Sequence, residues 1–371
     1  MICRTLKGLR TALVAVAALG WWMGANAQMT PANTTIANRA TVNYTVGGLT
    51  QAPVESSPSG NTTPGVGLGT ATTFVVDNRV DLTVAEVGAT ATTTTPGAPD
   101  AVLTYTVVNT GNAPQGYAFT LAEETTGSVF PAGNDNADFG LGSLVVRVDA
   151  GAPGYDAGDT AGAIDILNPG QTATVFVVSP SVPLTLLNGN RTNIRLQARV
   201  ARPNTGGATL ETQTGGVNDP TVVEVVFADA GRDATESAVD QFFIQSAAIT
   251  VTKSQNVLDD GFTTVDARAI PNALVEYTIG VTNTGFSAAN GIAISDPIPT
   301  TTTFQTGLYA GGSDVAITGG VAATCVAETL TDVNGDGCLR NNAGELIVGA
   351  PALVSIAPAG SVTVRFTVRI K

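Results

Sequence analysis

The segment Ser361-Val-Thr-Val-Arg-Phe-Thr-Val-Arg-Ile-Lys371 decides the fold class. Apolar and polar residues alternate along it, which places every apolar side chain on one face of an extended strand. These apolar residues are Val362, Val364, Phe366, Val368 and Ile370. A helix would require an apolar period of about 3.6 residues, so the segment predicts a β-strand with one buried face.

The same alternation recurs along the chain, beginning with Val42, Tyr44 and Val46. Clusters of Pro and Gly separate most of these runs, and only the N-terminus shows a helical pattern. Similar runs lie at Thr72–Val76, Val80–Val84, Val102–Val108, Thr172–Val178, Asn193–Val200, Val222–Phe227, Ile249–Thr252 and Val275–Val281. Aromatic residues make up only 5% of the chain, whereas Thr, Val, Ala and Gly are abundant. The sequence predicts an all-β protein built of thin β-sandwiches.

Residues 1–27 have the pattern of a signal peptide. Arg4, Lys7 and Arg10 precede an uncharged stretch from Thr11 to Met23, and Ala25-Asn-Ala27 supplies a cleavage site. The apolar core is too short to span a bilayer, and no later stretch is apolar for long enough, so we expect no transmembrane segment. The sequence predicts an exported protein at the cell surface, outside the cell or in the periplasm.

Charge and composition exclude several classes of function. Removing residues 1–27 takes away three of the 17 basic residues and none of the 30 acidic ones, which moves the net charge from −13 to −16. Such an acidic chain argues against nucleic acid or bare anionic membrane as a partner. The chain contains no His, so Ser-His-Asp and Cys-His catalytic arrangements are impossible. We expect no enzyme.

Internal repetition predicts the domain organisation. Leu103-Thr-Tyr-Thr-Val-Val-Asn-Thr-Gly-Asn112 resembles Tyr277-Thr-Ile-Gly-Val-Thr-Asn-Thr-Gly-Phe286, and both strands end in an Asn-Thr-Gly turn. Further on, 168–178 aligns without gaps with 358–368. Two tandem β-sandwich repeats are predicted, at 80–247 and 248–371. Residues 28–79 form either a short β segment of their own or a partial domain that completes the next one.

The second repeat resembles a known family. Val275-Glu-Tyr-Thr-Ile-Gly-Val-Thr-Asn-Thr-Gly285, followed by Ile294-Ser-Asp-Pro-Ile-Pro299, is similar to the bacterial surface-protein repeat known as domain of unknown function 11. Lys253 stands where that family often carries Lys on its first strand. The first repeat keeps the Asn-Thr-Gly turn but has Leu121-Ala-Glu-Glu124 in place of Asp-Pro. The resemblance implies immunoglobulin-like sandwiches arrayed on cell surfaces, and it implies no chemistry.

A candidate calcium loop lies at Asp332-Val-Asn-Gly-Asp-Gly337. Asp332, Asn334 and Asp336 alternate as in the opening of a calcium-binding loop, with the backbone carbonyl of Cys338 and the carboxylate of Glu345 as further ligands. The twelfth position, which is an acid in an EF-hand, is Ala343 here. A plain turn rich in Asp, Asn and Gly explains the pattern equally well. A weaker counterpart lies at 149–159, where we expect a solvated hairpin.

Two further predictions concern Cys and Lys side chains. Cys325 and Cys338 are the cysteines that remain after export, and their even number predicts a disulfide. Lys253 is expected to face solvent and to discourage pairing at a sheet edge. The closing strand at 361–371 is expected to belong to the second sandwich, the alternative being its donation to a neighbouring molecule.

The function that the sequence favours is a structural or adhesive cell-surface module without catalytic activity. Its partner would be an unidentified surface or matrix component. The alternative is a self-assembling filament or coat subunit that pairs with itself through strand edges. Calcium is the one cofactor that the sequence suggests.

If the loop at Asp332–Gly337 binds calcium, Asp336→Ala lowers the melting temperature in calcium and leaves it unchanged in chelator, because only the loaded loop depends on that carboxylate. Calorimetry in both buffers checks this. Equal effects in the two buffers would exclude the calcium hypothesis.

Overall fold

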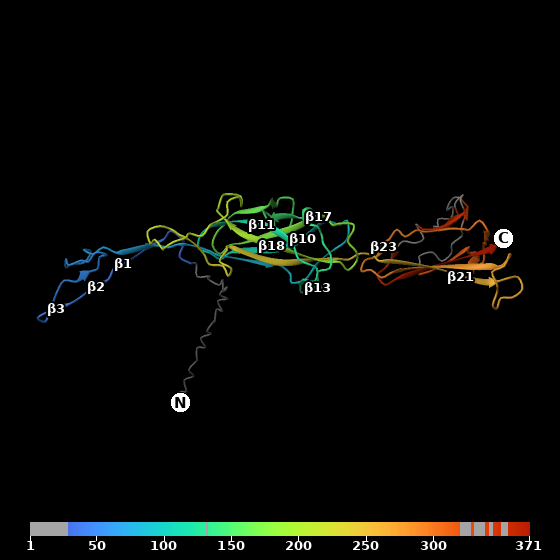
Figure 1. Cartoon of the computed structure of the whole chain (residues 1–371), viewed down its shortest axis with the longest axis horizontal. Helices are drawn as coiled ribbons and strands as arrows, with labels where there is room; N and C mark the ends of the chain where they lie inside the picture. The colour runs from blue at the N-terminus through green and yellow to red at the C-terminus, as the bar shows by residue number, and fades with distance from the viewer. Residues whose placement is uncertain (1–28, 131–132, 320–327, 330–337, 341–343, 350–354) are drawn as a thin grey trace, which may run out of the picture.

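The computed structural model describes residues 29–130, 133–319, 328–329, 338–340, 344–349 and 355–371. The predicted signal peptide lies outside them. Strands dominate the described residues, whose only helical elements are the two 3₁₀ turns η1 (Leu141–Ser143) and η2 (Ala310–Gly312). The prediction of an all-β chain with tandem immunoglobulin-like sandwiches is confirmed. Figure 1 shows a thin N-terminal arm, a first sandwich and a second sandwich arranged in a row along one long axis.

The arm, residues 29–76, consists of narrow β ribbons. Its strands pair only two at a time: β1 (Thr35–Asn38) with β6 (Thr72–Val75), β2 (Thr41–Val42) with β5 (Val54–Glu55), and β3 (Thr45–Val46) with β4 (Leu49–Thr50). No second sheet covers these ribbons among the described residues, and most of their side chains are exposed. The arm projects from the first sandwich, as Figure 1 shows.

The first sandwich has two five-stranded sheets. One has the order β15 (Thr160–Ala161), β14 (Val145–Val148), β17 (Thr172–Ser181), β10 (Pro99–Asn109), β8 (Leu82–Glu86). The other has the order β16 (Ala163–Leu167), β11 (Gln115–Glu123), β18 (Arg191–Ala201), β20 (Thr235–Ile244), β9 (Thr92–Thr94). Two short pairs flank them: β7 (Asn78–Val80) with β19 (Val225–Phe227), and β12 (Val129–Phe130) with β13 (Gly133–Asn134).

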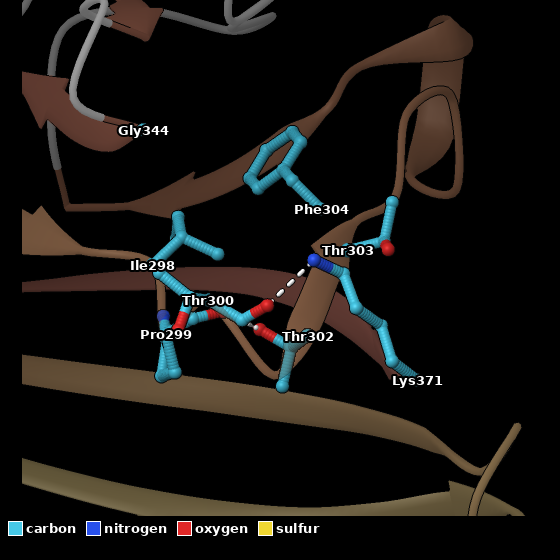
Figure 2. Close-up of a pocket in the computed structure, with 8 residues that line it drawn as sticks. All are labelled: Ile298, Pro299, Thr300, Thr302, Thr303, Phe304, Gly344 and Lys371. Carbon is cyan, nitrogen blue, oxygen red and sulfur yellow. Dashed lines mark hydrogen bonds between the residues drawn. The ribbon is translucent and has the colours of Figure 1, made fainter.

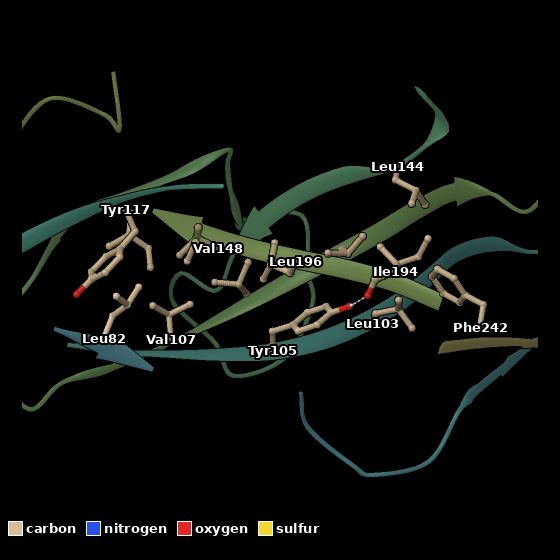
Figure 3. Close-up of a cluster of buried hydrophobic side chains, with 14 of the residues drawn as sticks. Leu82, Leu103, Tyr105, Val107, Tyr117, Leu144, Val148, Ile194, Leu196 and Phe242 are labelled. Atoms are coloured by element: carbon tan, nitrogen blue, oxygen red, sulfur yellow. Dashed lines mark hydrogen bonds between the residues drawn. The ribbon is translucent and has the colours of Figure 1, made fainter. Parts of the chain in front are cut away.

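Alternate side chains of both sheets fill the core of the first sandwich (Figure 3). On β10, Leu103, Tyr105 and Val107 are completely buried, as the period-two pattern predicts. The hydroxyl of Tyr105 crosses the core and donates a hydrogen bond to the carbonyl of Ile194 at 2.7 Å. Since an unpaired hydroxyl is costly in an apolar interior, this bond ties β10 of one sheet to β18 of the other.

The second sandwich has one large and one small sheet. The large sheet has the order β21 (Ile249–Asp259), β22 (Leu274–Asn283), β31 (Ser361–Ile370), β25 (Thr302–Phe304), and β26 (Val315–Thr318) also pairs with β31. The small one has the order β24 (Ile294–Pro297), β29 (Glu345–Val348), β28 (Cys338–Arg340), β27 (Glu328–Thr329), and β23 (Ala289–Asn290) pairs separately with β30 (Ser355–Ile356). The closing strand is therefore a central strand of its own sheet, as the favoured expectation has it.

The Asn-Thr-Gly turns build the same buried corner in both sandwiches. The amide of Asn283 donates hydrogen bonds to the carbonyls of Ser287 at 2.8 Å and Ile356 at 2.9 Å, while its oxygen accepts from Gly285 at 3.0 Å. In the first sandwich, the side-chain amide of Asn109 donates hydrogen bonds to the carbonyls of Ala113 at 2.9 Å and Leu167 at 2.8 Å. Its side-chain oxygen accepts one from the backbone N–H of Gly111 at 3.0 Å. Both Asn side chains are completely buried.

This corner explains the glycine of the motif. A Cβ on Gly285 would lie 2.2 Å from the carbonyl oxygen of Ser246, and one on Gly111 would lie 2.3 Å from that of Arg79. The backbone entering each sandwich therefore passes directly over the turn. Only glycine allows this close approach.

We expect Asn283→Ala to lower the free energy of unfolding of the second sandwich by about 3 kcal/mol, because it leaves buried backbone groups without partners. Asn109→Ala should do the same to the first sandwich. Calorimetry, which resolves the two transitions, checks this against the exposed control Asn218→Ala. An Asn283→Ala protein that melts like the control would contradict the role of the corner.

Candidate functional site

Most of the sequence-predicted site residues lie outside the described residues. These are Cys325, Asp332, Asn334 and Asp336. The calcium loop and the disulfide therefore stay predictions. Of the two remaining residues, Cys338 begins strand β28, where its backbone pairs with Val348.

Glu345, the fifth proposed calcium ligand, begins strand β29 opposite Pro297. Its carboxylate accepts a hydrogen bond from the hydroxyl of Ser295 on the neighbouring strand β24. The structure thus assigns this carboxylate a contact within the small sheet of the second sandwich.

The acidic loop at 149–159 is held by its own carboxylates. Asp159 is 7% exposed, and its two oxygens accept from the backbone N–H groups of Ala150 at 3.1 Å and Asp156 at 2.9 Å. Asp156 in turn accepts from Gly158 at 2.6 Å. The loop joins the antiparallel strands β14 and β15 and is exposed at 151–154 and 156–158, as the expectation of a solvated hairpin requires, while satisfying these N–H groups draws the side chain of Asp159 inward.

Ionisable groups do not converge on a cleft in the part of the chain that the structure describes. Within that part, no group of three or more His, Cys, Asp or Glu side chains is placed to hold a metal ion. Burial, with a smaller contribution from the nearby charge of Glu86, raises the pKa of Asp240 to about 7. Asp240 is only 2% exposed on β20, so this carboxyl belongs to the interior of the first sandwich.

A shallow pocket of about 270 Å³ lies in the second sandwich between Ile298 and Phe304 (Figure 2). Its lining includes no carboxylate. The ammonium group of Lys371 donates a hydrogen bond to the carbonyl of Thr300 at 2.5 Å, as the dashed line in Figure 2 marks. The pocket offers no acid–base pair for catalysis.

The most distinctive surface is the open edge of the second sandwich, by which we mean the gap between β21 and β24. Strands β23 and β24 are the counterparts of β11, because they follow the Asn283 turn as β11 follows the Asn109 turn. In the same way β30, which pairs with β23, is the counterpart of β16, which pairs with β11. In the first sandwich, β18 and β20 lie beyond β11. Among the described residues no strand pairs with the other edge of β24.

The exposure of the side chains that face each Asn-Thr-Gly corner shows what β18 and β20 cover in the first sandwich. Leu82 of β8 faces Asn109 across the ladder, and Ile249 of β21 faces Asn283 in the same way. Leu82 is 2% exposed, whereas Ile249 is 43% exposed. Strands β18 and β20 pack against β8. Among the described residues no strand covers the inward face of β21 in this way, and Val251 on that face is 61% exposed.

Lys253 links the two sheets across the open edge. It lies on the same face of β21 as Val251, and its ammonium nitrogen is 2.7 Å and 2.6 Å from the two carboxylate oxygens of Asp296 on β24. Asp296 is 5% exposed. The same nitrogen lies 4.7 Å from the centre of the Tyr277 ring. Lys253 is exposed on the edge strand β21, as expected, and in addition it supplies the cation for the buried carboxylate of Asp296.

A second feature is the junction between the sandwiches. The side-chain oxygen of Asn188 accepts from the backbone N–H of Ser246 at 2.8 Å and from that of Phe286 at 3.2 Å. The Phe243 and Phe286 rings meet edge to face with centres 5.6 Å apart, and the Arg191 guanidinium lies 3.8 Å from the centre of the Phe243 ring. The two sandwiches are thus joined by specific contacts as well as by the connecting chain.

Sequence reasoning missed both features. Of the junction residues only Phe286 directly follows an Asn-Thr-Gly turn, and Asn188, Arg191 and Phe243 stand in no local pattern that marks them as contacts.

The described residues contain no helix that is long and apolar enough to cross a membrane. No protein-family model matches the chain. No curated protein matches it in sequence.

Among solved structures, BspA_C_WT is similar over 78% of this chain and 91% of that chain, at 11% identity and a TM-score of 0.32. The class 5 fimbriae chaperone CfaA is similar over 75% of this chain and 83% of that chain, at 12% identity and a TM-score of 0.23. A chain of a chaperone–tip adhesin complex of CFA/I fimbriae covers 58% of this chain and 74% of its own length, at 12% identity and a TM-score of 0.23. Likenesses this weak carry no argument about function, and the fold assignment rests on the sheets described above.

We expect Lys253→Ala to lower the free energy of unfolding of the second sandwich by about 2 kcal/mol, because it leaves the buried Asp296 carboxylate without its cation. The expected loss in free energy of unfolding is smaller than the loss from breaking a fully buried ion pair, because Lys253 is partly solvated. Adding Asp296→Asn should recover part of the loss. Thermal unfolding of the two single variants and the double variant checks this, and strictly additive effects would contradict a coupled pair.

Proposed function

We propose that this chain is an exported, non-catalytic module that acts structurally or adhesively at a cell surface. The observation that carries the proposal is the junction at Asn188 and Phe286, together with the end-to-end order of the sandwiches in Figure 1. A hydrogen-bonded and ring-packed joint resists bending, which an ordinary linker does not. Holding domains apart in a line is what a display or adhesion module requires.

The arm is attached by the same device. Asn112 follows the first Asn-Thr-Gly turn at the position that Phe286 has after the second. Its amide donates to the carbonyls of Thr30 at 3.1 Å and Asp77 at 2.9 Å, and its oxygen accepts from Arg79 at 2.7 Å. The residue after each turn therefore fastens the preceding part of the chain, which supports an extended rod of successive units.

Export and family membership belong to the same proposal. The N-terminal pattern supports export to the cell surface, the extracellular space or the periplasm. The motif around Asn283 supports membership of the second sandwich in the domain of unknown function 11 repeats. Calcium at the 332–337 loop and a Cys325–Cys338 bridge would stiffen the same sandwich. An unidentified surface or matrix component would be the partner.

A second candidate function is a subunit that assembles with itself through strand edges. The narrow arm favours it, since its two-stranded ribbons carry exposed side chains and no second sheet covers them among the described residues. This function and the first one differ in assembly state. The rod-like order of the units is compatible with both.

We expect small-angle X-ray scattering of residues 28–371 to show an elongated particle, and Phe286→Ala combined with Asn188→Ala to broaden its distance distribution. These substitutions remove the ring contact and the two junction hydrogen bonds, so the sandwiches gain freedom to bend. Phe262→Ala is the control, because Phe262 is 88% exposed in the loop after β21. A wild-type chain as flexible as the double variant would overturn the rigid-rod proposal.

A further inference from the structure

We propose that two acids on the inner faces of the first sandwich, Asp240 of β20 and Glu86 of β8, make this domain sensitive to pH. Protonation of Asp240 holds the two sheets together, and its ionisation loosens them. The inference goes beyond the proposed function, because it concerns the conditions under which the rod is stable. It rests on strands of the first sandwich alone.

Strand register places the two acids on facing rungs of the two sheets. Glu86 lies opposite Tyr105 in the ladder of β8 and β10, and Asp240 lies opposite Ile194 in the ladder of β18 and β20. Direct partners across a ladder project to the same face. Since Tyr105 and Ile194 are completely buried in the core, Glu86 and Asp240 both lie on inward faces.

The two rungs are joined across the core. The hydroxyl of Tyr105 on one rung donates its hydrogen bond to the carbonyl of Ile194 on the other at 2.7 Å, as Figure 3 shows. Strand β20 also packs against β8, the strand that carries Glu86. The charge of Asp240 is therefore placed where the two sheets meet.

Asp240 has no cation to balance it in the part of the chain that the structure describes. Its side chain is 2% exposed and accepts a hydrogen bond from the backbone N–H of Gln241 at 2.6 Å. The groups that face it from β8 and β10 are the carboxyl of Glu86 and the hydroxyl of Tyr105. Glu236, further along the same face of β20, is a third acid.

The other strands that contact β20 do not supply a base either. Strands β9 and β12 carry no charged residue. On β18, Arg191 and Arg195 occupy the face opposite to Ile194, where they bond Gln241 and Glu124. A carboxylate buried in such surroundings destabilises the fold, whereas a neutral carboxyl does not.

The direction of the pH effect follows from the two states of the chain. Burial is the main cause that raises the pKa of Asp240 to about 7, and the charge of Glu86 adds to it. In an unfolded chain, Asp has a pKa of about 3.9. Between these values the folded chain retains a proton that the unfolded chain has lost, so the free energy of unfolding falls as the pH rises from about 4 to about 7. It does not fall further above that range on account of Asp240.

Tyr105 does not titrate in this range. Burial, together with the nearby charge of Asp240, raises the pKa of its hydroxyl well above the ordinary value. The bond from Tyr105 to Ile194 therefore keeps its proton throughout, and the expected pH response belongs to Asp240.

The strand that carries Asp240 also carries the junction to the second sandwich. Phe243 of β20 contacts the ring of Phe286, with centres 5.6 Å apart. Ionised Asp240 thus weakens the packing of the strand from which the second sandwich is held. An exported chain meets the pH of its surroundings directly, so acidification would strengthen the rod.

The test is calorimetry of residues 28–371 between about pH 5 and about pH 8 at constant ionic strength, following the transition of the first sandwich. We expect the wild type to melt about 5 °C or more higher at the acidic end. Asp240→Asn should abolish most of this difference, because the amide is neutral at every pH. Asp100→Asn is the matched control, since it removes the same charge from an exposed position on β10.

Two further measurements do not depend on how well Asp240→Asn folds. Glu86→Gln, at a half-buried position, should move the fall in melting temperature to lower pH, because it removes the like charge beside Asp240. In wild-type protein labelled with carbon-13 at Asp, one carboxyl signal should titrate with a midpoint of about 7, and that signal should be missing from Asp240→Asn.

Three results would overturn the inference. One is a pH profile of Asp240→Asn that matches those of the wild type and Asp100→Asn, and another is an Asp240 signal that titrates near pH 4. The third is a Glu86→Gln profile identical to that of the wild type, which would remove Glu86 from the pair. None of these results bears on the display function, which the scattering experiment tests.

Discussion

The buried carboxamide of Asn283, and that of Asn109 before it, is the contact on which the rest of the structure depends. Each amide joins the turn after a central strand to the last residue of the strand that precedes the next central one, which is Ile356 of β30 in one case and Leu167 of β16 in the other. It therefore sets the position of one sheet relative to the other at the end of each sandwich. Because the group is fully buried, every bond it leaves unmade carries a desolvation cost.

The same corner organises the chain beyond a single sandwich. The close passage of the incoming backbone over Gly285 and Gly111 leaves no space for a Cβ, so each sandwich is entered over its own turn. The next residue, Phe286 or Asn112, then contacts whatever precedes it. One local motif thus determines both the internal geometry of a unit and the way that units follow one another.

The two sandwiches share this corner, and among the described residues they differ in what covers the strand that faces it. Strands β18 and β20 bury Leu82 in the first, and the counterpart Ile249 in the second is exposed. The Lys253–Asp296 pair lies at this point, where an open interior would otherwise contain a carboxylate without a cation. A half-solvated ion pair adds little stability compared with an apolar strand, so it does not close the sandwich.

The sequence by itself determined the strands, the repeat and the corner, because alternation with a period of two and the Asn-Thr-Gly motif are local properties of the chain. Ser361–Ile370 shows this most clearly, since its apolar residues are the buried face of β31. Alternation assigns Ile249 and Val251 to an inward face in the same way.

Only the tertiary structure decided whether that face is covered, since the cover comes from strands far away in the sequence. The physical reason is that a strand encodes which of its side chains share a face, while burial of that face depends on a second layer that the strand does not encode. For the same reason, the partnership of Lys253 with Asp296 and that of Asn188 with Phe286 appeared only when the chain was folded.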